Sequence, residues 1–335
     1  MISYGKQSIN QDDIDAVVDV LKSDFLTQGP KVVEFENDLA NYCEVTYAKV
    51  VNNGTAALHL AYLAIGLEQG DIVWTTPNTF VATVNAALYC GATVDFVDIN
   101  PQTYNLSVER LAEKLVEAEK TGKLPKVVIP VHLCGQACDM AGIYALSQQY
   151  GFKIIEDASH AIGGQYLEKP IGGCQYSDIT VFSFHPVKII TTAEGGLATT
   201  NSKELAEKMR LFRSHGITRD KSLMTRDPDG AWYYQQVELG FNYRMNDLQA
   251  ALGISQLKRI DEFVIKRNKI KDRYDKLLQD LPVFLPVTNI DCYSASHLYC
   301  IQLDLKNLLK SHSNIFSELR SKGLGVNLHY IPVHL

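Results

Sequence analysis

The strongest constraint on the fold is an alternation of short apolar runs and helical patterns between residues 48 and 216. Seven runs typical of buried strands lie at 48–53, 71–76, 93–99, 126–132, 152–158, 178–184 and 195–200. Amphipathic helical patterns lie between them at 54–66, 79–91, 140–151 and 202–216, with one more after Ser107. This alternation predicts an α/β layered fold with a mainly parallel sheet.

Length and composition narrow the class of protein. A chain of 335 residues exceeds one hydrophobic core, so we expect a large domain and at least part of a smaller one. The net charge is −6 and no basic run is concentrated, which argues against binding to nucleic acid or an anionic membrane. No signal peptide or long apolar segment is visible, and seven cysteines are an odd number, so we expect a cytoplasmic protein with reduced thiols.

The first helical pattern begins near Asn10, which is expected to cap it. Asp12 and Asp13 occupy its first turn, where negative charge is favourable. The apolar residues of this pattern share one face of the helix, and they are Ile14, Val17, Val18 and Leu21.

The alternation stops at a long polar segment, residues 217–240, which carries the aromatic run Trp232 to Tyr234. A loop of this length is functional or disordered, and we expect a mobile lid on the substrate side. Residues 245–281 then predict one long helix that bridges to a small domain containing a helix near 313–321 and a strand at 324–330. We therefore expect a large domain at 1–240, and bridging helices with a small domain at 241–335.

Chemistry is expected in the loops that follow the strands, because ligands of such sheets bind beyond the carboxyl ends of the strands. Lys188 stands at the end of "VFSFHPVK", and "TTAEGG" returns at once towards another strand. A surface lysine is one interpretation. The other is a lysine in a crowded apolar pocket, whose lowered pKa makes the amine a nucleophile.

Two more strand ends carry groups that complement such a lysine. Asp157 ends the run "KIIED" and is either a helix cap or a carboxylate that faces a cationic ring nitrogen. Gly54 and Thr55 open a helix directly after a strand, a position that binds phosphate. Neither a G-x-G-x-x-G nor a P-loop pattern occurs. A lysine, a carboxylate and a phosphate site are what pyridoxal 5'-phosphate requires.

A possible metal cluster, His132 with Cys134 and Cys138, has no partner cluster to complete four ligands. Small buried cysteines in a loop are the preferred interpretation, and we expect no metal.

Many motifs in order resemble the DegT/DnrJ/EryC1/StrS aminotransferases, from "LTQGPKVVEFE" to "NLHYIPVH". Among them are "NGTAALHLA", "EDASHAIGG", "FSFHPVK", "TTAEGG" and "ELGFNYRMNDLQAALGISQL". The resemblance implies a fold-type I enzyme dependent on pyridoxal phosphate, with a seven-stranded sheet between helices and a smaller C-terminal α/β domain. Family members usually continue past the "HYIP" stretch, so that domain is expected to be incomplete.

The resemblance also implies the cofactor-binding residues. Lys188 would attach the cofactor and Asp157 would pair with its ring nitrogen. The others would contact the ring or the phosphate, and they are Gly54, Thr55, Phe80, His160, Ser183 and, from the neighbouring subunit of a homodimer, Asn242. For Phe80, core packing is the alternative.

Substrate residues implied by the resemblance are His185, Arg244 and His329. A structural ion pair is the alternative for Arg244, and an ordinary strand histidine is the alternative for His329. Within the family the motifs resemble most the branch that serves pseudaminic acid biosynthesis. This implies L-glutamate as amino donor and a UDP-linked 4-keto-6-deoxy sugar of the N-acetylaltrosamine type as acceptor.

Three alternatives stay open on the sequence alone. The keto position and nucleotide can differ, with C3 or C4 and UDP or dTDP all compatible. A sugar dehydratase of the same family carries histidine at the lysine position, so Lys188 argues against it. A non-catalytic nucleotide-sugar regulator would retain the lysine, the aspartate and the phosphate site only by coincidence.

Overall fold

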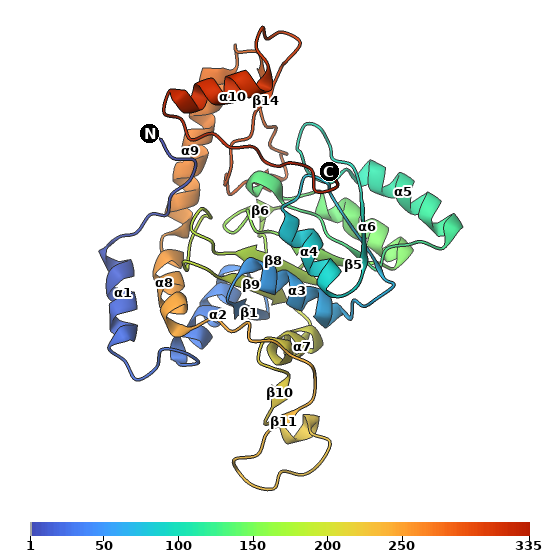
Figure 1. Ribbon diagram of the computed structural model, residues 1–335, viewed down its shortest axis with the longest axis vertical. Coiled ribbons are helices and arrows are strands. Elements are labelled where there is room, and N and C mark those ends of the chain that lie inside the picture. Colours follow the sequence, from blue (N-terminus) through green and yellow to red (C-terminus); the bar gives the residue numbers. More distant parts are fainter. Residues whose placement is uncertain (1) are drawn as a thin grey trace.

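The computed structural model describes residues 2–335 and places a seven-stranded sheet at the centre of the molecule (Figure 1). The strands, in sheet order, are β1 (Tyr47–Val51), β9 (Gly196–Thr200), β8 (Ile179–Ser183), β5 (Lys153–Asp157), β4 (Val127–Val128), β2 (Ile72–Thr75) and β3 (Thr93–Phe96). Only β9 runs antiparallel to its neighbours, β1 and β8. The predicted mainly parallel α/β sheet is confirmed.

Helices cover both faces of the sheet. The covering helices are α2 (Pro30–Tyr42), α3 (Gly54–Ile65), α4 (Val81–Tyr89), α5 (Val108–Thr121), α6 (Met140–Tyr150) and α7 (Lys203–Phe212). The strands alternate between two cores: Val181 packs with α3, α4 and α7, and Phe182 packs with α2, α5 and α6. None of the helices within residues 2–335 has the length and hydropathy needed to cross a membrane.

Helix α1 (Gln11–Leu21) has the predicted cap, since the Asn10 side chain accepts the Asp13 N–H at 3.1 Å. Its apolar face is only partly buried, because Ile14 and Leu21 are 48% and 57% exposed whereas Val17 and Val18 are half-buried. The helix instead buries Asp13, which accepts a hydrogen bond from Ser255 at 2.6 Å and pairs with Arg259 at 2.5 Å.

The predicted long helix is two helices, α8 (Asp247–Leu257) and α9 (Ile260–Leu278), separated at Lys258 and Arg259. The predicted strand at 324–330 is absent from the described chain except for one bridge between Leu324 and Ile2. The remaining C-terminal elements are β12 (Val283–Phe284), β13 (Cys292–Tyr293), β14 (Gln302–Leu303) and α10 (His312–Ser321). Strand β13 joins β6 (Gln165–Tyr166) and β7 (Lys169–Pro170), so the two parts of the chain share a small sheet.

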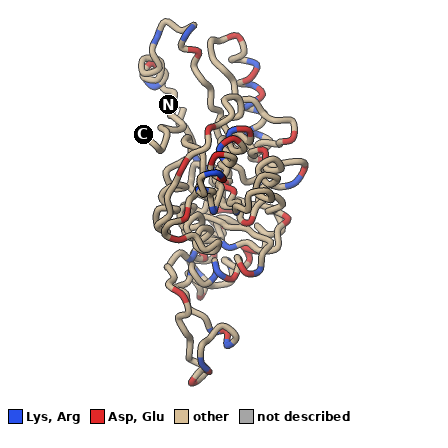
Figure 2. Tube along the Cα trace, turned by 90° about the vertical axis from the view of Figure 1, so that its right-hand side faces the viewer, with Lys and Arg blue, Asp and Glu red and all other residues tan. Residues whose placement is uncertain are grey.

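Residues 217–240 form an arm that projects from the end of the molecule opposite α10 (Figure 1). Strands β10 (Ile217–Thr218) and β11 (Gln235–Gln236) pair at its base, and a short 3-10 turn, η2 (Lys221–Leu223), lies beyond them. Basic and acidic residues both occur along the arm (Figure 2). Trp232 is 68% exposed, so this aromatic side chain packs little against its own subunit.

Candidate active site

Lys188 lies in the turn between β8 and β9, at the carboxyl end of β8. The turn is closed by backbone hydrogen bonds, including Lys188 N–H to the His185 carbonyl at 2.9 Å. The neighbouring Ile189 and Ile190 are buried. Burial lowers the pKa of the Lys188 amine to about 8, although the negative charge of Asp157 acts against the shift. A substantial fraction of this amine is neutral near physiological pH, which is the state of a nucleophile.

Asp157 ends β5, and hydrogen bonds hold both of its carboxylate oxygens. Thr83 Oγ donates to Oδ2 at 2.7 Å, and the Ser159 N–H donates to Oδ1 at 3.1 Å. Thr79 Oγ, just before α4, lies 2.8 Å from Thr83 Oγ, so the loop and the first turn of α4 together supply a hydroxyl chain to the carboxylate. Asp157 is 4% exposed and makes no ion pair within 4.0 Å to any residue in 2–335. A buried carboxylate of this kind can accept a cationic ring nitrogen.

The N-terminus of α3 faces the end of β8. Asn53 caps the helix by accepting the Ala56 N–H at 2.8 Å, which leaves the earlier N–H groups of Gly54 and Thr55 for a ligand. A Cβ at Gly54 would lie 3.0 Å from the Cβ of Ser183, so the glycine lets helix and strand approach closely. Asn52 Oδ1 is buried without a hydrogen-bond partner. The N–H groups of Gly54 and Thr55 fit the phosphate of pyridoxal phosphate.

His160 is buried next to these groups, and its tautomer follows from its contacts. The Cys134 N–H donates to Nδ1 at 3.3 Å, which places the proton of a neutral ring on Nε2. Burial lowers the pKa of His160 well below its ordinary value, and the positive charge of Lys188 lowers it further. Nε2 lies 3.2 Å from the Tyr330 hydroxyl. The His297 ring lies 4.5 Å from the His160 ring, between centroids.

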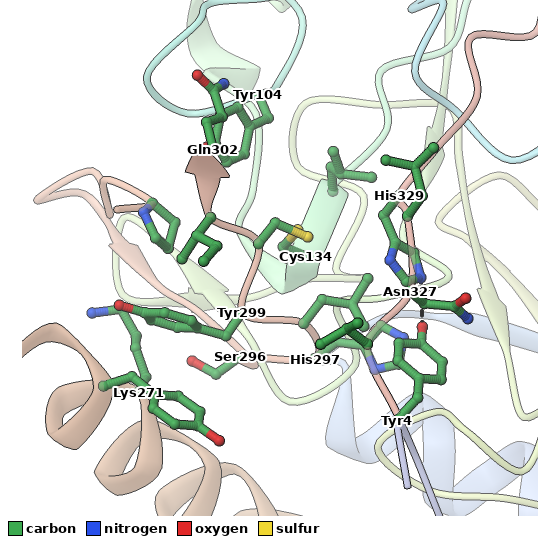
Figure 3. A pocket seen from close by; sticks show the side chains of 18 of the residues that line it. Tyr4, Tyr104, Cys134, Lys271, Ser296, His297, Tyr299, Gln302, Asn327 and His329 are labelled. Carbon is green, nitrogen blue, oxygen red and sulfur yellow. Dashed lines mark hydrogen bonds between the residues drawn. The ribbon is translucent and has the colours of Figure 1, made fainter. Parts of the chain in front are cut away.

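A cavity of about 830 Å³ lies beside this group and is lined by Tyr104, His297, His329 and Tyr330 among others (Figure 3). Tyr4 closes one side of it, since its hydroxyl lies 2.6 Å from His329 Nε2 and the two rings stack at 5.1 Å. Burial lowers the pKa of His329, and the charge of Lys188 adds to the shift. The cavity wall formed by Tyr4, His329 and Tyr330 is therefore aromatic and hydrogen-bonding, and Arg267 and Lys271 add positive charge to the lining.

The other predicted residues lie around these groups. Phe80 is 55% exposed at the start of α4, and its ring lies 5.8 Å from that of Tyr330. His185 is exposed on the turn that carries Lys188. Asn242 and Arg244 lie at the base of the arm, where Asn242 pairs with Ser214 and Arg244 pairs with Val51 through the backbone. Arg244 therefore lies next to the phosphate site, and Asn242 is exposed.

Sequence reasoning missed four residues of this site. Thr83 had a usable signal, because it follows Thr79 by four positions on a helix and so shares its face. Tyr4, His297 and Tyr330 had none, since they come from segments far apart in the chain and no local pattern links them.

The possible metal ligands His132, Cys134 and Cys138 contact other residues of the protein. His132 Nε2 lies 2.7 Å from Glu156 Oε2, and its Nδ1 accepts the Cys138 N–H at 3.1 Å. Cys134 faces Cys300 instead, with 3.2 Å between the sulfur atoms. Across residues 2–335 no three His, Cys, Asp or Glu side chains are grouped as metal ligands would be.

Comparison with known proteins places this geometry in context. A model of the "DegT/DnrJ/EryC1/StrS aminotransferase family" matches residues 7–335. A Campylobacter jejuni protein named UDP-4-amino-4,6-dideoxy-N-acetyl-beta-L-altrosamine transaminase is 40% identical over 336 residues, which are 100% of this chain and 85% of that protein. The spore coat polysaccharide biosynthesis protein SpsC of Bacillus subtilis is 39% identical, over 100% of this chain and 84% of its own.

Solved structures agree with the sequence relatives. Helicobacter pylori PseC, described as an aminotransferase involved in the biosynthesis of pseudoaminic acid, superposes with a TM-score of 0.90 at 33% identity, over 99% of this chain and 85% of its own. The putative sugar aminotransferase Spr1654 of Streptococcus pneumoniae, in its pyridoxamine phosphate form, has a TM-score of 0.89 at 30% identity, over 99% and 86%. The same protein is also solved with pyridoxal phosphate.

Proposed function

This chain belongs to the DegT/DnrJ/EryC1/StrS aminotransferase family, and on that premise we propose that it transfers an amino group from L-glutamate to the C4 keto carbon of a UDP-linked keto-deoxy sugar. Family membership makes it a sugar aminotransferase dependent on pyridoxal phosphate. The observation that carries the chemistry is the half-buried Lys188, whose pKa is lowered to about 8 at the same sheet edge as Asp157.

Each group of the site has a role towards the cofactor. When bound, pyridoxal phosphate supplies a ring that accepts electrons from the carbon whose proton is lost. Asp157 would keep the ring nitrogen protonated. Gly54, Thr55 and Ser183 would hold the phosphate, with Asn242 of a second subunit. His160 would donate its Nε2 proton towards the phenolic side of the ring.

Lys188 would both attach the cofactor and move the proton. Its Nζ can take a proton from the substrate carbon and return it, because an amine of pKa near 8 exchanges protons readily around neutral pH. The apolar turn excludes water from the amine, which keeps that pKa low. Phe80 would cover one side of the ring.

The assignment of the sugar depends on relatives and on the cavity. Two Campylobacter jejuni relatives that share the altrosamine transaminase name are 40% and 41% identical to this chain. The cavity of about 830 Å³ has room for a sugar nucleotide, and its hydroxyls and imidazoles can bond to sugar oxygens and a ketone. His329, Tyr4 and Tyr330 are the candidate sugar contacts, with Arg244 for the diphosphate and His185 at the rim.

A different nucleotide keto-sugar is the alternative acceptor. A Caulobacter vibrioides relative named GDP-perosamine synthase is 35% identical to this chain, so related sequences differ in the nucleotide sugar named. A dehydratase is disfavoured by the lysine, and a regulator without catalysis has no need for an amine with a lowered pKa.

We also propose a homodimer, because apolar side chains lie exposed on two helices near the site. Ile14 and Leu21 of α1 and Val81 and Leu88 of α4 are all close to half exposed. A second subunit would cover such faces and bring its own arm towards this site. A cytoplasmic location and the domain boundary at residue 240 remain proposals as well.

The test is an assay of purified protein with L-glutamate and a panel of UDP-, dTDP- and GDP-linked 3-keto and 4-keto sugars. We expect turnover with the UDP-4-keto-6-deoxy-N-acetyl sugar above all others, with amino sugar and 2-oxoglutarate formed one to one. Lys188→Ala should abolish turnover, while Lys123→Ala, at an exposed helix end, should not. Turnover in Lys188→Ala would refute the chemistry, and a preference for another sugar would refute the substrate.

A further inference from the structure

Two cysteine side chains are in contact where the central sheet packs against the C-terminal part of the chain. Cys134 lies in the 3-10 turn η1 (Leu133–Gly135) after β4, and Cys300 lies just before β14. Their sulfur atoms are 3.2 Å apart although the residues are 166 positions apart in sequence. Both residues line the cavity, and Figure 3 shows Cys134 facing into it. A small oxidant in the cavity can therefore reach the pair.

The backbone holds the two segments in register. The Cys134 carbonyl accepts the N–H groups of His297 at 2.9 Å and Leu298 at 3.3 Å, and the Ala295 N–H donates to the Gly135 carbonyl at 3.0 Å. A disulfide has an S–S bond of about 2.05 Å, so each sulfur has to move by roughly half an ångström. Side-chain rotation is enough for that movement, and the hydrogen bonds between the segments can stay in place.

The two thiols also differ in acidity. The Cys134 S–H donates to the Cys300 sulfur, and this hydrogen bond lowers the pKa of Cys300 against the effect of burial. Cys300 is thus the more readily deprotonated of the two thiols, and the thiolate is the form that attacks an oxidant.

We propose that Cys134 and Cys300 are a redox modification site, which a peroxide converts to a disulfide. The Cys300 thiolate attacks one peroxide oxygen, the O–O bond breaks, and hydroxide leaves and is protonated to water. The Cys134 sulfur then attacks the sulfenic acid of Cys300, the S–O bond breaks, and a second water leaves with the thiol proton. Two thiols lose two electrons, and the peroxide gains them.

The linkage would act on the site because Cys134 supports both buried histidines. Its N–H bonds to His160 Nδ1 and its carbonyl bonds to the His297 N–H. A disulfide would tie the cavity wall that carries His297 to the turn that carries Cys134. We expect slower exchange of the sugar in the oxidised protein, a consequence that rests on the proposed function.

The test uses the full chain, reduced and then treated with a small excess of hydrogen peroxide. We expect the number of titratable thiols after denaturation to fall from seven to five. Mass spectrometry should find the peptides of Cys134 and Cys300 linked, and the melting temperature should rise by several degrees. Cys300→Ser should prevent the linkage and the rise. Cys90→Ser, a thiol on the end of α4, is the matched control and should retain both.

Three results would overturn the proposal: seven thiols remaining, a linkage between other cysteines, or over-oxidation of Cys300 without a linked peptide. None of these measurements requires turnover, so they are independent of the proposed function. For the functional consequence, kcat/KM for the sugar should fall at least threefold on oxidation and recover with dithiothreitol. Formation of the linkage with unchanged sugar kinetics would refute the regulatory consequence alone.

Discussion

Replacing Thr83 by valine should weaken the support of the Asp157 carboxylate. Thr83 lies on α4 and is 1% exposed. The substitution keeps the shape of the side chain and removes the hydroxyl that donates to Asp157 Oδ2 at 2.7 Å. It also removes the partner of the Thr79 hydroxyl, which lies 2.8 Å away. The carboxylate then loses one of its two donors and keeps only the Ser159 N–H.

The magnitude follows from the charges involved. A hydrogen bond to a charged group contributes about 1.5–3 kcal/mol, and the orphaned Thr79 hydroxyl adds about 1 kcal/mol. We therefore expect the free energy of unfolding of the cofactor-free protein to fall by about 2.5–4 kcal/mol. Since Asp157 is also less firmly held, kcat should fall by about tenfold or more, with little change in the KM for the sugar.

Urea unfolding measures the first quantity, with the fluorescence of the buried Trp74 as reporter. Thr83→Ser is the matched control, because it retains the hydroxyl and should lose less than half as much. If Thr83→Val and Thr83→Ser unfold at the same urea concentration and have equal kcat, the hydroxyl does not support the carboxylate and the reasoning is wrong.

Further predictions test the amine, the carboxylate, the dimer and the arm. The pKa of Lys188 is about 8, and only the neutral amine attacks a carbonyl, so the rate at which pyridoxal phosphate attaches to the cofactor-free protein should rise about tenfold per pH unit up to pH 8 and then level off. Stopped-flow absorbance measures this rate, and a profile with its midpoint near pH 10.5 would contradict the prediction. Asp157→Asn should lower kcat by orders of magnitude, because losing the buried charge costs roughly 2–5 kcal/mol of transition-state stabilisation. A near-normal kcat would show that Asp157 only caps the chain at the end of its strand. Lys188→Ala and Asn242→Asp should regain activity when mixed as exchanging dimers; no regain would place Asn242 in its own subunit's site. Residues 217–240 should gain protection from hydrogen exchange when the UDP-sugar binds but not when glutamate binds, and Trp232→Ala should raise the KM for the sugar alone. Protection in the absence of ligand would show that the arm has only a structural role.

The sheet could be predicted from sequence because its strands are buried on both faces. Runs such as 152–158 and 178–184 have consecutive apolar residues at their centres, so their signal depends on no particular partner. Lys188, Asp157 and Gly54 could be proposed together because parallel strands end at one edge of the sheet. The exposure of Ile14 could not be predicted from its periodicity, which indicates an apolar face but not which molecule covers it.

The sequence did not predict the parts of the structure that depend on contacts between residues far apart in the chain. The stretch 324–330 has a strand-like composition, yet only Leu324 finds a partner, and without a ladder no strand forms. Lys258 and Arg259 divide the long helix because Arg259 turns to the buried Asp13, far away in sequence. His297 joins the site through Cys134 and the His160 ring, contacts that no local pattern encodes.

The contact between Tyr4 and His329 has a consequence for biosynthesis on the ribosome. Apart from Asn242 of a second subunit, the residues proposed to hold the cofactor all lie within the first 190 positions, whereas the contact between Tyr4 and His329 spans 325 positions. At about 5–20 residues per second, the ribosome needs on the order of ten seconds more to produce the partner of Tyr4. The nascent chain can thus complete its cofactor pocket before it can enclose a sugar. The cofactor would then be able to act as a folding ligand for an unfinished protein.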